Sequence, residues 1–337
     1  MNIISAVSSR HKKMIYDPIR IHAIRNSIPK NHNLENTIVL TGLPRSGTTW
    51  LGEILNTIPN SAIIFEPLHL RKVPEAEKAG FTWQTLFQDG EGSGSPEKFM
   101  REVLCGRVIN KWTARELTVK KSKQAEMIIV KFVRASNLLG WLSSTFPIRK
   151  PLFIIRHPCA VISSQIERNI HPDACIDHLY AAPVIKLYPH LKSKLEPLKT
   201  PMEILAAHWC IGNYYAMTIL HKQCFELICY EQLVSEGVSQ LEKIFSAIGV
   251  KVPQNALEQL KIPSMTAHLG DPWKGGNPLA VWQRRLSDNE IESILAVVKS
   301  FGMDFYTDKL EPDYSRLYTY TNKLEPELMN DQNRQFH

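Results

Sequence analysis

A short turn between an apolar run and a helical pattern carries the first side chains whose types and spacing suggest chemistry. In the segment TIVLTGLPRSGTTWL, residues 37–51, Gly42 and Gly47 have the spacing of the phosphate-binding loop G-x-x-x-x-G-K-[ST]. A strand that leads through such a turn into a helix surrounds an anion with backbone N–H groups and the positive end of the helix. The side chains that would add donors to this anion site are Arg45, Ser46, Thr48 and Thr49.

The lysine of the usual phosphate-binding loop is missing, since Thr48 stands at its position. In enzymes that use nucleoside triphosphates, this lysine contacts the terminal phosphates and the following threonine holds magnesium. Its absence indicates a ligand with a shorter phosphate chain, which the always-charged guanidinium of Arg45 would approach from the side of the loop. For this segment alone, an ordinary strand–turn–helix is the alternative interpretation.

A second candidate anion site follows a later apolar run. The segment KPLFIIRHPCAVISSQIER, residues 150–168, reads as a buried strand that ends at Arg156 and leads into a helix with Pro158 in its first turn. Ser164 follows Arg156 by eight residues, which is a little over two helical turns. Because ligands of open α/β sheets bind at the carboxyl ends of the strands, this arginine and serine predict a second anion site.

The elements that must position these residues follow from an alternation of short β-rich runs and helical segments. This alternation predicts an α/β fold with a P-loop-like parallel sheet flanked by helices on both faces. The predicted strands are Ile38–Thr41, Ala62–Phe65, Met127–Lys131, Leu152–Arg156 and Phe225–Tyr230. Helices are expected to begin near Thr48, Ser136, Cys159, Pro201 and Ser287 and after Tyr230, with Ser287 and Glu290 forming a capping-box pattern.

We expect a single domain over residues 36–306, with a helical insert around 77–125 after the second strand. Residues 1–35 form a basic N-terminal arm, because residues 1–33 carry six basic side chains against one acidic side chain. A solvated terminus is preferred here over a contact with nucleic acid or an anionic membrane. Residues 307–337 are expected to form a polar C-terminal tail that frays or lies over the surface.

Composition and motifs exclude several classes of protein. Hydrophobic residues make up 44% and charged residues 22% of the 337, as in a soluble globular protein. No apolar run approaches the roughly 20 residues that cross a bilayer, and no secretory signal is recognised, so we expect a cytoplasmic protein without an integral membrane segment. The six cysteines form no C-x-x-C and are expected to be reduced and buried. No metal-binding or nucleic-acid-binding motif appears.

Together, the two candidate anion sites resemble those of the sulfotransferases that use 3′-phosphoadenosine 5′-phosphosulfate (PAPS) as sulfuryl donor. LPRSGTTW at residues 43–50 and RHPCAVISS at residues 156–164 are similar to motifs of the carbohydrate and tyrosylprotein branches. The resemblance implies that Arg156 and Ser164 bind the 3′-phosphate, and that adenosine 3′,5′-bisphosphate (PAP) is the product. It also implies that the first motif binds the 5′-phosphosulfate without a metal, through Arg45, Ser46, Gly47, Thr48, Thr49 and Trp50.

The leaving group of such a reaction is the 5′-phosphate, on which negative charge develops, and Arg45 would stabilise that charge. The acceptor hydroxyl needs a base, and the resemblance suggests Glu66 in the strand-end segment FEPL. A structural carboxylate is one alternative for Glu66, and His69 is the rival base. Lys131, at the end of the strand MIIVK, would approach the transferring sulfonate, with Arg134 as its neighbour. Surface charge is the alternative for both cations.

Other segments depart from the cytosolic aryl and steroid sulfotransferases, which have Y-P-K-S-G-T-T-W and a catalytic histidine in K-T-H-L-P. This chain lacks both patterns. The late loop of those enzymes is faintly echoed by GDPWKGG, residues 270–276, where Lys274 would contact the donor. The segment CYEQLV, residues 229–234, is typical of the wider family and is interpreted as structural.

These patterns predict an enzyme that moves the sulfuryl group of PAPS to a hydroxyl of a glycan, a glycolipid precursor or a small hydroxylated metabolite. An oligomer is compatible with the sequence, and no nucleic acid partner is expected. A P-loop kinase-like nucleotide enzyme is the alternative, which the missing lysine and the lack of a clear metal-binding aspartate disfavour. A non-catalytic protein that kept the fold is a further alternative, which the intact donor motifs disfavour.

Overall fold

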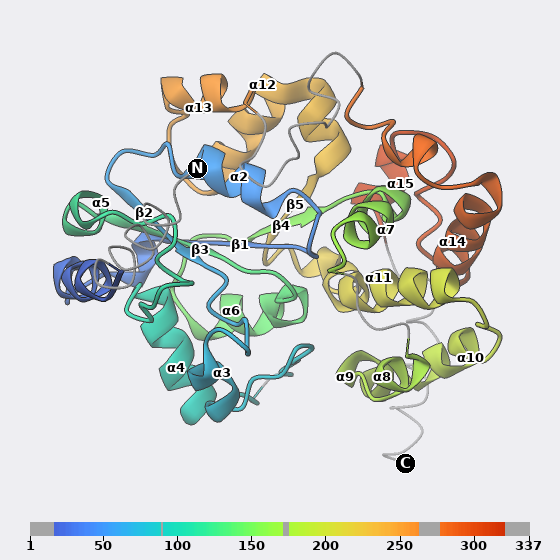
Figure 1. Ribbon diagram of the computed structural model, residues 1–337, viewed down its shortest axis with the longest axis horizontal. Coiled ribbons are helices and arrows are strands. Elements are labelled where there is room, and N and C mark those ends of the chain that lie inside the picture. The colour runs from blue at the N-terminus through green and yellow to red at the C-terminus, as the bar shows by residue number, and fades with distance from the viewer. Residues whose placement is uncertain (1–16, 89, 171–174, 263–276, 321–337) are drawn as a thin grey trace, which may run out of the picture.

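Five parallel strands form one sheet in the order β2-β3-β1-β4-β5, at the centre of the molecule in Figure 1. The computed structural model describes residues 17–88, 90–170, 175–262 and 277–320. The strands are β1 (Thr37–Thr41), β2 (Ser61–Phe65), β3 (Met127–Lys131), β4 (Leu152–Ile155) and β5 (Glu226–Cys229). The predicted strands are confirmed, with ends that differ by at most one residue. Arg156 and Tyr230, predicted as the last residues of their strands, directly follow β4 and β5.

Both faces of the sheet are apolar, because successive residues of a strand point to opposite sides. Ile38 and Leu40 of β1 pack into one cluster, whereas Val39 packs into a cluster on the opposite face. On β4, Ile154 joins the first cluster and Phe153 joins a third cluster on the opposite face. Helices must therefore cover both sides of the sheet, as parallel sheets require.

The helices divide between the two faces as Figure 1 shows, which confirms the predicted α/β fold. On one face lie α2 (Thr48–Leu55) and α12 (Tyr230–Ala247), with α13 (Gln254–Gln259) packed against α2. On the other lie α4 (Ser95–Leu104), α6 (Leu139–Thr145), α7 (Pro158–Glu167) and α11 (Pro201–Thr218), with α14 (Asp288–Ser300) packed against α7 and α11. The shorter helices are α3 (Pro74–Lys78), α5 (Val119–Lys123), α8 (Ile176–Tyr180), α9 (Pro183–Leu187), α10 (Lys192–Leu195) and α15 (Tyr314–Tyr318). Single 3₁₀ turns are η1 (Leu34–Asn36), η2 (Ser136–Leu138), η3 (Pro189–Leu191), η4 (Leu220–Lys222) and η6 (Trp282–Arg284).

The predicted helix starts agree with these bounds. Residue 136 begins a 3₁₀ turn that continues directly into α6, and Pro158 occupies the first position of α7. The Ser287 side chain accepts a hydrogen bond from the Glu290 N–H, and the Glu290 side chain accepts from Ser287 in return. This confirms the capping box before α14. Within the described ranges, no helix combines the length and apolar character needed to span a bilayer.

Part of the basic arm is packed rather than solvated. Residues 17–27 are helical, and Ile24 of this helix is fully buried. Arg20 donates a hydrogen bond of 2.8 Å to the Leu117 carbonyl, and Arg25 donates one of 2.7 Å to the Ile109 carbonyl. Guanidinium donors therefore satisfy carbonyls of the segment between β2 and β3, a role that charge counting along the sequence does not reveal.

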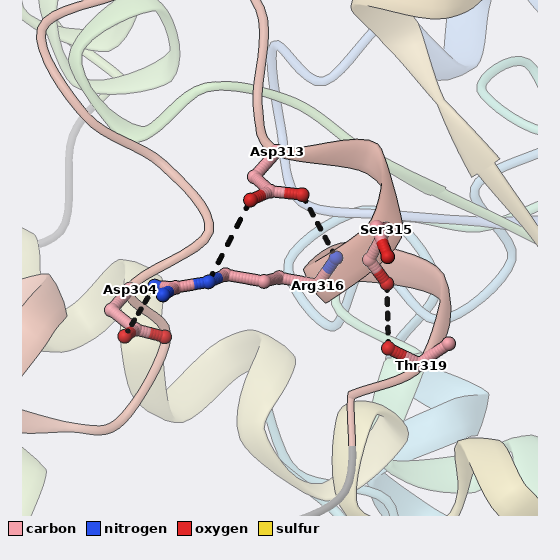
Figure 2. A network of polar contacts seen from close by, with 5 residues as sticks. All are labelled: Asp304, Asp313, Ser315, Arg316 and Thr319. Carbon is pink, nitrogen blue, oxygen red and sulfur yellow. Dashed lines mark hydrogen bonds and ion pairs between the residues drawn. The ribbon is translucent and has the colours of Figure 1, made fainter.

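The described part of the C-terminal segment also packs onto the domain, through α15. Figure 2 shows Arg316 between Asp304 and Asp313, with N···O distances of 2.9 and 3.6 Å. Asp313 also accepts a hydrogen bond of 3.1 Å from the Arg316 N–H, and so caps the helix. Leu317 on the same helix is fully buried. Since the ion pairs themselves are exposed, burial of Leu317 contributes more to this attachment.

The six cysteines are free thiols, and four of them are buried as expected, whereas Cys175 and Cys224 are half-buried. Burial raises the pKa of Cys159 to about 12 and places the pKa of Cys210 well above its ordinary value. Because the thiolate is the reactive form, these buried side chains act as small apolar groups.

Candidate active site

The carboxyl edge of the sheet places the predicted site residues in a row. Glu66 follows β2 and Lys131 ends β3, the strand next to it. The glycine-rich loop of residues 42–47 follows β1, and Arg156 follows β4 on the other side of β1. The order along the edge is therefore carboxylate, lysine, loop and arginine. Neighbouring strands lie about 4.8 Å apart, so the whole row spans roughly 14 Å from β2 to β4.

The glycine-rich loop needs its two glycines for close packing. Gly47 has a φ of 98°, and a Cβ there would lie 2.5 Å from the ring of Tyr230. A Cβ on Gly42 would lie 2.4 Å from the Ile154 carbonyl oxygen of β4. Either change would push the loop away from β4 and β5. The glycines therefore hold the start of α2, with its unpaired N–H groups, at the edge of the sheet.

Direct contacts join the two predicted anion sites. Arg45, with a φ of 76°, donates from Nε to Ser164 Oγ over 2.9 Å. Arg156 donates from Nη1 to the Arg45 carbonyl over 3.1 Å. Gln165, beside Ser164 on α7, donates to the Pro44 carbonyl over 2.9 Å. The loop and the β4–α7 turn thus form one continuous, positively charged surface.

Aromatic neighbours hold both the guanidinium and the backbone carbonyl of Arg156. Its guanidinium carbon lies 4.0 Å from the Tyr230 ring centroid, which is cation–π stacking. Trp209 donates from its indole N–H to the Arg156 carbonyl over 3.2 Å. Nε of Arg156 is buried and has no hydrogen-bond partner among the described residues. A fixed guanidinium with an unsatisfied donor suits an incoming anion.

A buried polar network lies behind Arg156. Glu231, from the segment predicted to be structural, accepts from the His157 N–H over 2.9 Å and from the Tyr306 hydroxyl over 3.1 Å. The His157 ring stacks on Trp282 with centroids 4.5 Å apart. Burial lowers the pKa of His157 to about 4 and raises the pKa of Glu231. This network fixes the β4–α7 turn that carries Arg156.

The lowered pKa of His157 predicts that the folded protein loses stability in mild acid. Its pKa is about 6.5 in the unfolded chain and about 4 when folded, so the unfolded state binds more protons between these values. Linkage gives a loss of about 2 kcal/mol in the free energy of unfolding from pH 7 to pH 5. Glu231, with its raised pKa, acts with the opposite sign. His157→Asn keeps a capping side chain before α7 and removes the titration.

Urea unfolding of wild type and His157→Asn at the two pH values isolates this contribution. We expect the difference in stability between the proteins to shrink by about 2 kcal/mol in acid. A difference that stays the same at both pH values would show that His157 titrates normally in the folded protein.

Glu66 and Lys131 form a close pair at the β2–β3 end of the row. Lys131 Nζ donates to Glu66 Oε1 over 2.7 Å, and the Glu66 N–H donates to the Lys131 carbonyl over 2.7 Å. The Glu66 side chain is 13% exposed and the Lys131 side chain 2%, so solvent reaches the carboxylate more than the ammonium. Burial lowers the pKa of Lys131, and the Glu66 carboxylate opposes that shift. The pair therefore places a held carboxylate and a desolvated cation beside the loop.

His69 lies on the turn directly after Glu66. Its backbone N–H donates to the Glu66 carbonyl over 3.1 Å. Its ring lies between Trp83 and Trp112, at centroid distances of 5.2 and 4.9 Å. Burial lowers the pKa of His69, so its imidazole is neutral at pH 7. Its Nδ1 is buried without a partner in the described part of the chain. The rival base is thus in the site and shares the turn of Glu66.

The segment between β2 and β3 supplies site residues that were not singled out from the sequence. Trp112 packs edge-to-face on Phe65, with centroids 5.2 Å apart, and the Arg115 guanidinium lies 4.4 Å from the Phe65 ring centroid. Burial raises the pKa of Glu116, and the charge of Lys131 opposes this. Only the fold shows that WTARE, residues 112–116, lies beside the end of β2.

The remaining predicted residues have different settings. Ser46 and Thr48 are buried in the loop and the first turn of α2, next to half-buried Thr49. Trp50 is 5% exposed, and its indole N–H donates to the Ile262 carbonyl over 3.1 Å. Lys274 lies outside the described residues. Across the described ranges, no group of three His, Cys, Asp or Glu side chains has the arrangement of a metal site.

A comparison with protein families identifies the family to which this chain belongs. The model of the sulfotransferase family matches residues 37–254, which include the loop, the Glu66–Lys131 pair and the β4–α7 turn. The chain belongs to the sulfotransferase family. This sulfotransferase is thus a transferase of sulfuryl groups. A comparison with the curated proteins found no match.

Distant structural likenesses accompany this family match. The sulfotransferase domain from the Synechococcus PCC 7002 olefin synthase has 18% identity and a TM-score of 0.44, over 83% of this chain and 98% of that one. The domain from the curacin biosynthetic pathway has 16% identity and a TM-score of 0.41, over 85% and 96%. A mouse sulfotransferase in complex with PAP has 12% identity and a TM-score of 0.40, over 82% and 88%. At these scores the likenesses carry no argument about the site.

Proposed function

We propose that this sulfotransferase moves the sulfuryl group of PAPS to a hydroxyl of a glycan, a glycolipid precursor or a small hydroxylated metabolite. The order of residues along the sheet edge carries this proposal. A carboxylate and a lysine lie on one side of the loop, and an arginine lies on the other side. A donor with a phosphate at each end fits from the loop to β4, which leaves the β2–β3 end for the acceptor.

In this proposal, the loop and α2 bind the 5′-phosphosulfate through Arg45, Ser46, Gly47, Thr48 and Thr49. Arg156 and Ser164 bind the 3′-phosphate. The hydrogen bond of 2.9 Å from Arg45 to Ser164 supports a single donor site, because it joins side chains of the two proposed phosphate sites. The unsatisfied Nε of Arg156 adds a donor for the second phosphate.

Glu66 acts as the base. It accepts the proton of the acceptor hydroxyl while the acceptor oxygen forms a bond to sulfur and the bond from sulfur to the bridging phosphate oxygen breaks. Arg45 and the loop N–H groups stabilise the charge on the departing phosphate, and Lys131 stabilises the sulfonate oxygens. The Lys131 contact of 2.7 Å also holds the carboxylate at the acceptor end.

Two measurements test the proposal. First, we expect PAP without magnesium to raise the melting temperature, whereas ATP with magnesium has no comparable effect. Second, incubation with PAPS and a panel of glycans, glycolipid precursors and hydroxylated metabolites is expected to yield a sulfated product by mass spectrometry. Stabilisation by magnesium and ATP alone would instead support the P-loop kinase-like alternative.

A further inference from the structure

Four rings form a continuous row beside Glu66. We call Phe65, Trp112, His69 and Trp83 the aromatic row. Their successive centroids are 5.2, 4.9 and 5.2 Å apart, with interplanar angles of 78°, 71° and 75°. Edge-to-face rings at such distances stabilise each other. The aromatic row is therefore a pre-organised cluster that starts at buried Phe65, the last residue of β2, and whose other three rings are half-buried.

Positive charge lines this aromatic row. The Arg134 guanidinium lies 5.0 Å from the Trp83 centroid, and the Arg115 guanidinium lies 5.4 Å from the Trp112 centroid. Lys72 Nζ lies 6.0 Å from the Trp112 centroid. Within the described part of the chain, no ion pair joins any of these three cations to a carboxylate. The surface is therefore complementary to an anion.

The nearby carboxyl groups do not cancel this charge. Glu66 is already paired with Lys131. Burial raises the pKa of Glu116, with Lys131 and Arg115 opposing, and this favours the neutral form of the carboxyl. Burial lowers the pKa of Arg134, the Glu66 carboxylate opposes this shift, and the charge of Arg71 adds to it, so a further cation acts near the same end of the aromatic row.

Two polar atoms of the aromatic row lack partners. His69 Nδ1 and Trp112 Nε1 are both buried and find no hydrogen-bond partner among the described residues. Buried polar atoms in folded proteins almost always have a partner. Hydroxyl or ring oxygens of a bound molecule are complementary to such polar atoms, so they support a polar ligand at the aromatic row.

We propose that the acceptor is a ring-bearing hydroxyl compound that also carries an oxyanion, and that the aromatic row binds it beside Glu66. The ring packs against Trp83 or Trp112, and the oxyanion takes the N–H edge of Arg134 or Arg115. The backbone N–H of Arg134 donates to the Gly42 carbonyl over 3.4 Å, so this residue lies next to the proposed donor loop. The inference rests on the proposed function for the reaction at the hydroxyl, but not for the anion binding.

Calorimetry on matched probes tests this acceptor class. The pairs are p-nitrophenyl glucuronide and p-nitrophenyl glucoside, hydroxyphenylacetate and hydroxyphenylacetamide, and phenyl phosphate and phenol. In at least one pair, the acid is expected to bind the wild-type protein about tenfold more tightly than its neutral partner. Arg134→Gln is expected to remove that preference and to leave the affinity for the neutral probe within about twofold. The pair that shows the effect identifies the oxyanion as carboxylate or phosphate.

Arg101→Gln is the matched control, because Arg101 also stacks on a ring, 5.4 Å from the Phe146 centroid, but outside the aromatic row. This control should keep the preference for acids. Lys72→Gln, at an exposed position, is the second variant if Arg134→Gln fails to fold, and it should weaken the preference. PAP titrated into the same samples reports the donor site separately.

Equal affinities within every pair, or no binding of any acid, would overturn the proposed acceptor class. So would a loss of PAP affinity in Arg134→Gln, since Arg134 would then belong to the donor site. If the wild-type protein binds the acids but not PAP, the proposed function fails while the anion site stands.

Discussion

Glu66→Gln is expected to reduce turnover by a factor of about 10² to 10⁴, because an amide cannot accept the proton of the acceptor hydroxyl. The amide oxygen still accepts the hydrogen bond that Lys131 donates over 2.7 Å, so the local geometry is kept. PAP affinity should change little, since Glu66 lies on the acceptor side of the loop. Initial rates with PAPS and the identified acceptor, together with PAP titrations, measure both quantities.

His69→Gln is the control for this prediction, because His69 lies on the same turn and is the rival base. We expect this variant to retain turnover far better than Glu66→Gln, with its main effect on the KM of the acceptor. If Glu66→Gln keeps the wild-type turnover while His69→Gln loses it, His69 is the base and our assignment is wrong.

Arg156→Ala is expected to weaken PAP binding by a factor of about 10² or more. Removing one partner of a desolvated ionic hydrogen bond costs about 2–5 kcal/mol, and the loss here is the contact with the 3′-phosphate. The Trp209 indole contacts only the backbone carbonyl of Arg156, which the substitution keeps, so the β4–α7 turn should stay folded. Titration calorimetry of PAP, with melting temperatures as a check on folding, measures the effect.

Arg156→Lys is the graded control. It keeps the charge but loses the stacking on Tyr230 at 4.0 Å and the planar fork of donors, so its PAP affinity should fall between those of wild type and Arg156→Ala. PAP affinity that is unchanged in Arg156→Ala would mean that the 3′-phosphate lies elsewhere.

The sheet and its functional edge could be predicted from the sequence because both depend on local patterns. Short runs such as Met127–Val130 are apolar at every position, which distinguishes doubly buried strands from amphipathic helices. Since parallel strands end at one edge, the residues after them were expected to meet there. Glu66 and Lys131 do meet, with a contact of 2.7 Å, although they are 65 residues apart in the sequence.

The contacts between side chains of distant segments could not be predicted in this way. Arg45 and Ser164 were assigned to opposite ends of the donor, yet they share a hydrogen bond of 2.9 Å. Trp112 and Arg115 contact Phe65 because the segment between β2 and β3 folds back over the end of β2, and no periodicity in the sequence encodes that return. Arg25 looked like part of a solvated charged arm, but it donates to a carbonyl 84 residues away.

Titration of PAP and adenosine 5′-phosphate into wild type and Arg156→Ala, without magnesium, tests the central claim most directly. The claim is that one edge of the sheet binds both phosphates of the donor, so wild type should bind PAP at least about tenfold more tightly than adenosine 5′-phosphate. Arg156→Ala should bind the two nucleotides about equally. A wild-type protein that does not distinguish them, or a variant that keeps the full preference, would contradict the account.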